Sequence, residues 1–178
     1  MNYSVSDVLI SAEQIAEKVR KLGEDIGRDY DGQDLMVIGI LKGAVIFLSD
    51  LVRAIPATVE VSLDFMAVSS YGDSTKTSGI VRIVKDLDSS IKGRNILLVE
   101  DIVDTGLTLA YLVKLMHERE PRSLQICALL DKEERRRVHV PIRYRGFSIP
   151  DTFVVGYGLD YSGKWRGYPD IRTVEAAD

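Results

Sequence analysis

Cysteine, histidine and tryptophan are scarce in this sequence. Its 178 residues include one cysteine, two histidines and one tryptophan. A single thiol excludes an internal disulfide and is typical of a reducing compartment. Cys127 lies in an apolar run, where a buried small hydrophobe is a better interpretation than a nucleophile. His117 and His139 have no partners at ligand spacing, so we predict no zinc site.

Long apolar runs and an excess of basic residues are also missing. No segment approaches the roughly 18 apolar residues of a membrane-spanning helix. Residues 1–7 contain no basic segment leading into an apolar core, so we expect no signal peptide. The net charge of −4 gives no electrostatic argument for nucleic acid as the main partner. These absences predict a cytoplasmic protein with neither a membrane nor a nucleic acid as partner.

Familiar nucleotide-binding and catalytic motifs are absent as well. Residues 158–164 match most of a P-loop pattern, but Trp165 stands where that pattern requires Ser or Thr. The chain has no Gly-x-Gly-x-x-Gly fingerprint. Without a Cys pair or a Ser/His/Asp arrangement, covalent nucleophilic catalysis has no obvious agent. What remains is positioning and electrostatics.

The apolar patterns that are present predict a single α/β domain. Residues 35–41, 96–99 and 124–130 are apolar on both faces, which is typical of central parallel strands. Helical periodicity predicts helices at 11–29, with Ser11 and Gln14 as a capping box, at 44–55, and from Leu109 onward. Further strands are predicted at 59–65, where apolar residues alternate with Glu60, Ser62 and Asp64, and at 80–87, 144–149, 153–159 and 171–174. We expect a mainly parallel sheet flanked by helices, with a core at about 35–140 and a small hood formed by about 141–178 and the N-terminal residues.

A polar segment separates two of the predicted strands. Between Ser69 and Gly79 the only apolar group is the ring of Tyr71. A linker and a mobile lid are both open interpretations, since long polar loops in compact domains are often binding loops. Tyr71 is an odd choice for a linker, which favours the flexible lid.

The most informative stretch is residues 96–109. An apolar run meets the adjacent carboxylates Glu100 and Asp101, then becomes small and polar before helical spacing begins. This pattern places the carboxylates at the carboxyl end of a buried strand, where open α/β sheets bind ligands. Residues 105–108 lie where the next helix begins, so backbone N–H groups and hydroxyls there can surround a phosphate. Carboxylates beside an anion cradle predict a ribose phosphate with magnesium.

Other charged residues follow predicted strands directly. Lys42-Gly43 and Lys132 share this position with Glu100-Asp101 and Asp104. In a parallel sheet these groups would line one edge. Such a site suits displacement of a charged leaving group from a sugar, and its oxygen ligands favour Mg²⁺.

Residues 99–108, Val-Glu-Asp-Ile-Val-Asp-Thr-Gly-Leu-Thr, resemble the phosphoribosyl-diphosphate signature of the type I phosphoribosyltransferases. Leu41-Lys42-Gly43 is similar to the pyrophosphate loop of the hypoxanthine-guanine phosphoribosyltransferases, and Ser70-Tyr71 resembles the start of their closing lid. Residues 147–161 resemble their purine-binding tail. These blocks occur in the family's order and span residues 35–168.

The resemblance implies a type I phosphoribosyltransferase fold and a purine-salvage reaction. In that reaction 5-phosphoribosyl 1-diphosphate and hypoxanthine or guanine give the nucleoside 5′-monophosphate and pyrophosphate. The resemblance also implies Mg²⁺ as cofactor and a homodimer or homotetramer. In family members the peptide bond before the pyrophosphate-loop lysine can be cis.

The resemblance further implies a role for each matching residue. Those facing the purine are Asp104, the proposed general base at N7, Lys132 at the 6-oxo group, Phe153 stacked on the ring and the Val154 backbone. The remaining groups bind ribose, phosphates, metal or lid, and they are Glu100, Asp101 and Asp160 (metal and ribose), Asp104, Thr105, Gly106, Leu107 and Thr108 (5′-phosphate), Lys42, Gly43 and Arg166 (pyrophosphate), and Ser70 and Tyr71 (lid). Leu107 is a departure, because eukaryotic members carry Lys there.

Two alternatives to this function stay open. A phosphoribosyltransferase-fold regulator that binds RNA or DNA would need a basic surface, for which residues 135–137 are the only candidate patch. A xanthine-preferring relative is compatible with the sequence, whereas an adenine-specific one is disfavoured because the Lys132 ammonium would repel the amino donor at position 6. The sequence does not rank hypoxanthine against guanine.

Overall fold

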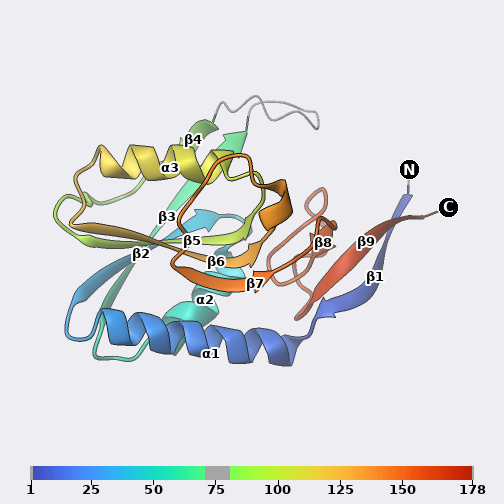
Figure 1. Cartoon of the computed structure of the whole chain (residues 1–178), viewed down its shortest axis with the longest axis horizontal. Helices are drawn as coiled ribbons and strands as arrows, with labels where there is room; N and C mark the ends of the chain where they lie inside the picture. Colours follow the sequence, from blue (N-terminus) through green and yellow to red (C-terminus); the bar gives the residue numbers. More distant parts are fainter. Residues whose placement is uncertain (1, 71–80, 178) are drawn as a thin grey trace.

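The computed structural model describes residues 2–70 and 81–177. A six-stranded sheet in the order β4-β3-β2-β5-β6-β7 has α3 on one face and α1 and α2 on the other (Figure 1). A smaller sheet in the order β1-β9-β8 lies at one end of the molecule and pairs the first strand with the last (Figure 1). Tyr71 and nearly all of the predicted lid lie outside the described residues.

The elements follow one another in the alternation that the sequence predicts. The central sheet comprises β2 (Asp34–Leu41), β3 (Glu60–Ser70), β4 (Val81–Lys85), β5 (Asn95–Val103), β6 (Ser123–Asp131) and β7 (Tyr144–Ser148). The helices are α1 (Ala12–Asp29), α2 (Val45–Ala54), α3 (Leu107–His117) and the short 3₁₀ helix η1 (Glu133–Arg135). The small sheet comprises β1 (Asn2–Ile10), β8 (Val154–Val155) and β9 (Ile171–Ala177).

The central strands are buried on both faces because their sequences are apolar on both faces. Along β5, Leu97 and Val99 pack in the cluster beneath α1 and α2, while Ile96 and Leu98 pack with α3. Strands β3, β2, β5, β6 and β7 pair in parallel, and β4 pairs antiparallel with β3. The predicted fold class, a mainly parallel sheet flanked by helices, is confirmed. Within the described part of the chain, no helix is long and apolar enough to span a membrane.

Helix α1 begins where its capping residues predict. The Ser11 hydroxyl accepts the Gln14 N–H at 3.2 Å, and the Ser11 N–H donates to Gln14 Oε1 at 2.9 Å. This reciprocal pair provides acceptors for the backbone N–H groups of Ser11 and Gln14, which have no hydrogen-bond partner within the helix. The apolar stripe of the helix, which includes Ile15 and Ile26, is buried against the sheet.

The strand predicted at 59–65 is present as β3, but its alternation does not describe which side chains are buried. Leu63 is 49% exposed, whereas the Asp64 side chain is buried with 4% exposure. Asp64 is satisfied there because its oxygens accept the backbone N–H groups of Phe65 (2.7 Å) and Asp88 (2.9 Å). A buried carboxylate with such donors is stable. The alternation of polar and apolar residues in 59–65 therefore does not show which face of β3 is buried.

The hood differs from the prediction in three places. Strand β1 was not predicted, since its pairing partner β9 lies at the other end of the chain. Strand β7 is the edge of the central sheet, so that sheet extends beyond residue 140. The strand predicted at 153–159 is limited to Val154–Val155, because Gly156 (φ +100°) and Gly158 (φ +101°) turn the chain out of the extended conformation.

Cys127 provides a test of this packing. It is fully buried in β6, and burial raises the pKa of its thiol well above the ordinary value. We therefore expect a thiol reagent to label the native protein only at the rate of global unfolding, because the thiolate is the reactive form. The measurement is the labelling rate against urea concentration. Fast labelling that does not depend on urea would contradict the packing described for β6.

Candidate active site

The site lies at the carboxyl ends of β2, β5 and β6. The chain moves from β2 to β3 on one side and from β5 to β6 and β7 on the other, so the boundary between β2 and β5 is the topological switch point. Open parallel sheets bind ligands at such a point. Lys42 follows β2, Glu100 and Asp101 lie near the end of β5, and Lys132 follows β6. The structure therefore brings the predicted strand-end groups to one edge.

Glycine is required where these strand ends meet. The peptide bond between Leu41 and Lys42 is cis. A Cβ atom on Gly43 would lie 1.7 Å from the Asp101 Oδ2 atom, and one on Gly158 would lie 2.1 Å from the Gly43 carbonyl oxygen. No side chain fits in either position. The loop after β2, the carboxylate of β5 and the turn after β8 are thus in direct contact.

Two adjacent carboxyl groups lie near the end of β5, Glu100 buried and Asp101 partly buried. Glu100 is only 8% exposed, and burial together with the Asp101 charge raises its pKa well above the usual range. Burial also raises the pKa of Asp101 to about 6, although its Oδ1 accepts the Ile102 N–H at 2.8 Å and Arg166 favours its charged form. Asp160 raises the Asp101 pKa further. Carboxylates held this way attract a cation.

The donor set fits a magnesium ion. Among residues 2–70 and 81–177, no three His, Cys, Asp or Glu side chains form a cage for a metal. Mg²⁺ does not need one, because it is usually held by one or two carboxylates together with water and substrate phosphates. The hard, partly buried carboxylate oxygens of Asp101 and the nearby Asp160 suit that ion. Asp160 is fixed in place, because Arg166 Nη2 lies 2.6 Å from Oδ1 and the Gly163 N–H donates to Oδ2 at 2.6 Å.

An anion cradle follows β5 at the beginning of α3. Gly106, with φ +82°, is the N-cap of α3. Residues of this turn, including Asp104, Thr105 and Thr108, line a cavity of about 110 Å³ together with Glu100 of β5. The N–H groups at a helix N-terminus and the hydroxyls of Thr105 and Thr108 suit a phosphate group.

A second cavity lies between this turn and the hood. It measures about 210 Å³ and is bordered by Asp101, Asp104, Lys132, Phe153, Val154 and Asp160, among others. Lys132 is buried, while Phe153 is 48% exposed and presents its ring to solvent. The Tyr161 ring meets Phe153 edge to face at 5.4 Å and stacks with Trp165 at 6.1 Å. An exposed ring supported in this way suits stacking against a planar base.

Arg135 and Asp151, for which no role in the site is predicted, contact this cavity's charged groups. Arg135 Nε donates to Asp104 Oδ1 at 2.7 Å, and Arg135 Nη1 donates to Asp151 Oδ2 at 3.2 Å. Asp151 Oδ1 lies 3.7 Å from Lys132 Nζ. In the sequence, residues 135–137 stand out only as a candidate basic patch. The only sign in the sequence that Arg135 belongs to the site is its short spacing from Lys132, which the 3₁₀ helix η1 converts into proximity.

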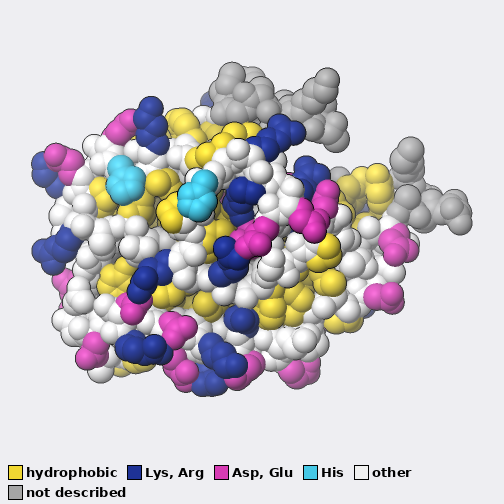
Figure 2. Space-filling model, viewed as in Figure 1, with side chains coloured by type: hydrophobic (Ala, Val, Ile, Leu, Met, Phe, Trp, Pro, Cys, Tyr) yellow, Lys and Arg dark blue, Asp and Glu magenta, His cyan; other side chains and the backbone are white. Residues whose placement is uncertain are grey.

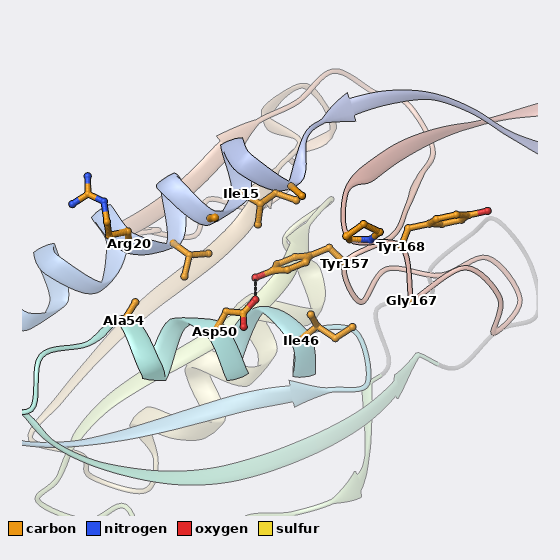
Figure 3. A pocket seen from close by; sticks show the side chains of 12 residues that line it. Ile15, Arg20, Ile46, Asp50, Ala54, Tyr157, Gly167 and Tyr168 are labelled. Carbon is orange, nitrogen blue, oxygen red and sulfur yellow. Dashed lines mark hydrogen bonds between the residues drawn. The ribbon is translucent and has the colours of Figure 1, made fainter.

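A third cavity, of about 520 Å³, lies away from the strand ends, between α1, α2 and the hood (Figure 3). Its walls are mostly apolar, and the Tyr157 hydroxyl donates to Asp50 Oδ2 at 2.6 Å across it (Figure 3). Burial and this bond raise the pKa of Tyr157. The bond joins the hood to α2, the helix that follows the Lys42-Gly43 loop.

Comparison with known proteins agrees with this geometry. Residues 7–162 match the family model of the phosphoribosyl transferase domain. The chain belongs to the phosphoribosyl transferase family. It is 52% identical over 177 residues to the hypoxanthine-guanine phosphoribosyltransferase of Mycobacterium avium (96% of this chain, 86% of the relative) and 47% identical to that of Bacillus subtilis strain 168 (99% and 97%). A crystal structure of a hypoxanthine-guanine phosphoribosyltransferase from Bacillus anthracis superposes with a TM-score of 0.91 at 46% identity, covering 96% of this chain and 99% of that one.

Family membership confirms the resemblance seen in residues 99–108, together with the predicted fold and the enzyme class, a phosphoribosyltransferase. The structure also gathers the candidate phosphoribosyltransferase residues after β2, β5, β6 and in the hood around one edge of the sheet. Tyr71 falls outside the described residues, and Ser70 is the last residue of β3. The individual role of each residue remains a prediction.

The basic patch needed by a nucleic-acid-binding phosphoribosyltransferase relative is largely neutralised. Arg135 pairs with Asp104 and Asp151, and Arg136 pairs with the buried Asp131. On the face shown in Figure 2, basic and acidic side chains are interspersed rather than gathered by sign. An interspersed surface does not attract a polyanion strongly.

Asp101 gives a prediction about stability. Its pKa is 3.8 ordinarily and about 6 in the folded protein, so the folded state binds its proton more tightly. The contribution of this group to stability is therefore lost as pH rises from about 4 through about 6. Asp101→Asn removes that loss. We therefore expect the Tm of the variant minus the Tm of wild type, both measured with EDTA, to increase between about pH 4 and about pH 6 and then to level off. Asp31→Asn, at an exposed carboxylate, is the control. A Tm difference that is flat or falls with pH would contradict the prediction.

Proposed function

We propose that the protein is a purine-salvage enzyme that transfers the 5-phosphoribosyl group from 5-phosphoribosyl 1-diphosphate to hypoxanthine or guanine. The C1′–O bond to pyrophosphate breaks and the C1′–N9 bond forms, giving IMP or GMP and pyrophosphate. The observation that carries the proposal is the contact of the Lys42-Gly43 loop with Asp101 beside the anion cradle of α3. The activity named in the relatives' own designations supports the same reaction.

The substrate parts match the groups along the sheet edge. The 5′-phosphate suits the turn at residues 104–108, because the N–H groups and helix dipole there favour an anion. The ribose hydroxyls suit the Glu100 and Asp101 carboxylates. Lys42 and Arg166 supply positive charge for the departing pyrophosphate, on which negative charge grows in the transition state.

The purine suits the cavity of about 210 Å³. Phe153 provides the ring on which the base stacks, and the Val154 backbone meets its edge. The Lys132 ammonium donates to the 6-oxo oxygen and would repel the 6-amino group of adenine. Asp104 accepts or holds the purine proton at N7 as N9 attacks.

Magnesium is part of this proposal. Asp101 and Asp160 would hold it, with Glu100 near, and the bound ion would stabilise negative charge on the pyrophosphate. The cytoplasmic location and a homodimer or homotetramer also belong to the proposal, and rest on the single cysteine and on family resemblance respectively.

The substrate range tests the function directly. We expect pyrophosphate release from 5-phosphoribosyl 1-diphosphate to require Mg²⁺ and either hypoxanthine or guanine, with adenine inactive because of Lys132. The measurement is the initial rate with hypoxanthine, guanine, xanthine and adenine. Xanthine as the best substrate would identify a xanthine-preferring relative. No release with any base, combined with RNA retained in filter binding, would favour the regulator instead.

Asp104 provides the test of the base. Replacement by Asn preserves the shape and removes both charge and basicity, so kcat should fall by about 10²–10⁴-fold, the usual contribution of a general base. Binding of 5-phosphoribosyl 1-diphosphate should change far less, since the backbone donors of the turn remain. Steady-state kinetics with both substrates varied separates the two effects. A near-normal kcat would make Asp104 a structural residue at the start of α3, for which Asn is an adequate replacement.

A further inference from the structure

Four charged side chains of alternating sign form a continuous chain beside the purine cavity. Asp104 bonds to Arg135, Arg135 to Asp151, and Asp151 pairs with Lys132. The two ends of the chain, Asp104 and Lys132, border the cavity of about 210 Å³. The two middle members, Arg135 and Asp151, do not line that cavity in the described part of the structure. They therefore act on a bound base only through the ends.

We propose that Arg135 is a positioning residue, which fixes the carboxylate of Asp104 at the purine cavity and is itself anchored by Asp151. This proposal rests on the function proposed above. Arg135 Nε donates to the Oδ1 atom of Asp104, and among the described residues no other hydrogen bond engages that carboxylate. One oxygen is thus held while the other stays available to a ligand. A catalytic base needs such an orienting partner, because a general base works only within hydrogen-bond reach of the proton it accepts.

The backbone around Arg135 supports this geometry. Arg135 closes the short helix η1, where its N–H donates to the Lys132 carbonyl at 3.1 Å. The same segment is joined to the phosphate turn, since the Arg137 N–H donates to the Thr105 carbonyl at 2.9 Å. The positions of Lys132, Arg135 and Asp104 are therefore fixed relative to one another by backbone bonds as well as by ion pairs.

Arginine suits this position better than lysine does. Its planar guanidinium directs Nε and Nη1 to two different carboxylates at once, 2.7 Å from Asp104 and 3.2 Å from Asp151. A lysine ammonium is a single point charge on a flexible stem and cannot hold both in one plane. Because Asp151 also pairs with Lys132, the group that meets purine N7 and the group that meets the 6-oxo oxygen share one support.

A double-mutant cycle tests whether Arg135 acts through Asp104. Arg135→Gln, Asp104→Asn and the double variant are compared with wild type for kcat and KM with hypoxanthine. We expect Arg135→Gln to lower kcat/KM for the purine by roughly 10- to 100-fold, the effect of a small misplacement of a catalytic group. In the Asp104→Asn background the same change should cost little more, because effects of groups that act as a unit are not additive. The KM for 5-phosphoribosyl 1-diphosphate should stay unchanged.

Two further variants keep the result interpretable. Arg137→Gln removes the same charge from an exposed side chain nearby and should behave as wild type. Arg135→Lys should restore part of the loss and serves in the same cycle if Arg135→Gln does not fold, as judged by Tm.

The outcomes separate the two proposals. A wild-type protein without activity would refute the proposed function itself. An active wild type whose loss at Arg135 persists undiminished in the Asp104→Asn background, or an Arg135→Gln variant with an unchanged or higher rate, would overturn the positioning role alone.

Discussion

The parallel pairing of β2 with β5 is the constraint on which the rest of the structure depends. It aligns Gly39 with Val99, so the loop after β2 emerges directly over the carboxylates at the end of β5. The contact is so close that Gly43 has no room for a Cβ atom beside Asp101. Helices α2 and α3 begin just after these two strand ends, and both cavities of the site are lined by residues at the carboxyl end of β5.

This arrangement places function and stability in opposition. Burial of Glu100 and Asp101 raises the pKa of both groups and disfavours their charged forms, which a well-packed apolar core would avoid. A divalent cation and the hydroxyls of a ribose are the kinds of ligand that relieve such a cost. The burial of these carboxyl groups therefore lowers the stability of the unliganded protein and preorganises the site for its ligands, a common trade-off between stability and activity.

The hood is joined to the core by a few specific contacts. Tyr157 bonds to Asp50 of α2, and Gly158 packs on the Gly43 carbonyl. Within the hood, the Tyr161 ring contacts the Tyr3 ring of β1, with their centroids 4.7 Å apart. The last strand also contacts the site directly, because the Val174 N–H of β9 donates to the Phe153 carbonyl at 3.0 Å. The Phe153 ring and the Asp160 carboxylate border the same cavity as the strand-end groups, although they come from the loops on either side of β8.

The sequence alone determined the family, the parallel α/β core and the strand-end position of the main site residues, because apolar periodicity and the stretch at 99–108 are local properties of the chain. The sequence did not predict strand β1, the burial of Asp64 or the ion pair between Arg135 and Asp104. The two residues of that ion pair are 31 positions apart in the chain. Each of these depends on which distant backbone groups packing brings together. A carboxylate is buried, or a base oriented, only when tertiary structure supplies its donors, and no local pattern contains that information.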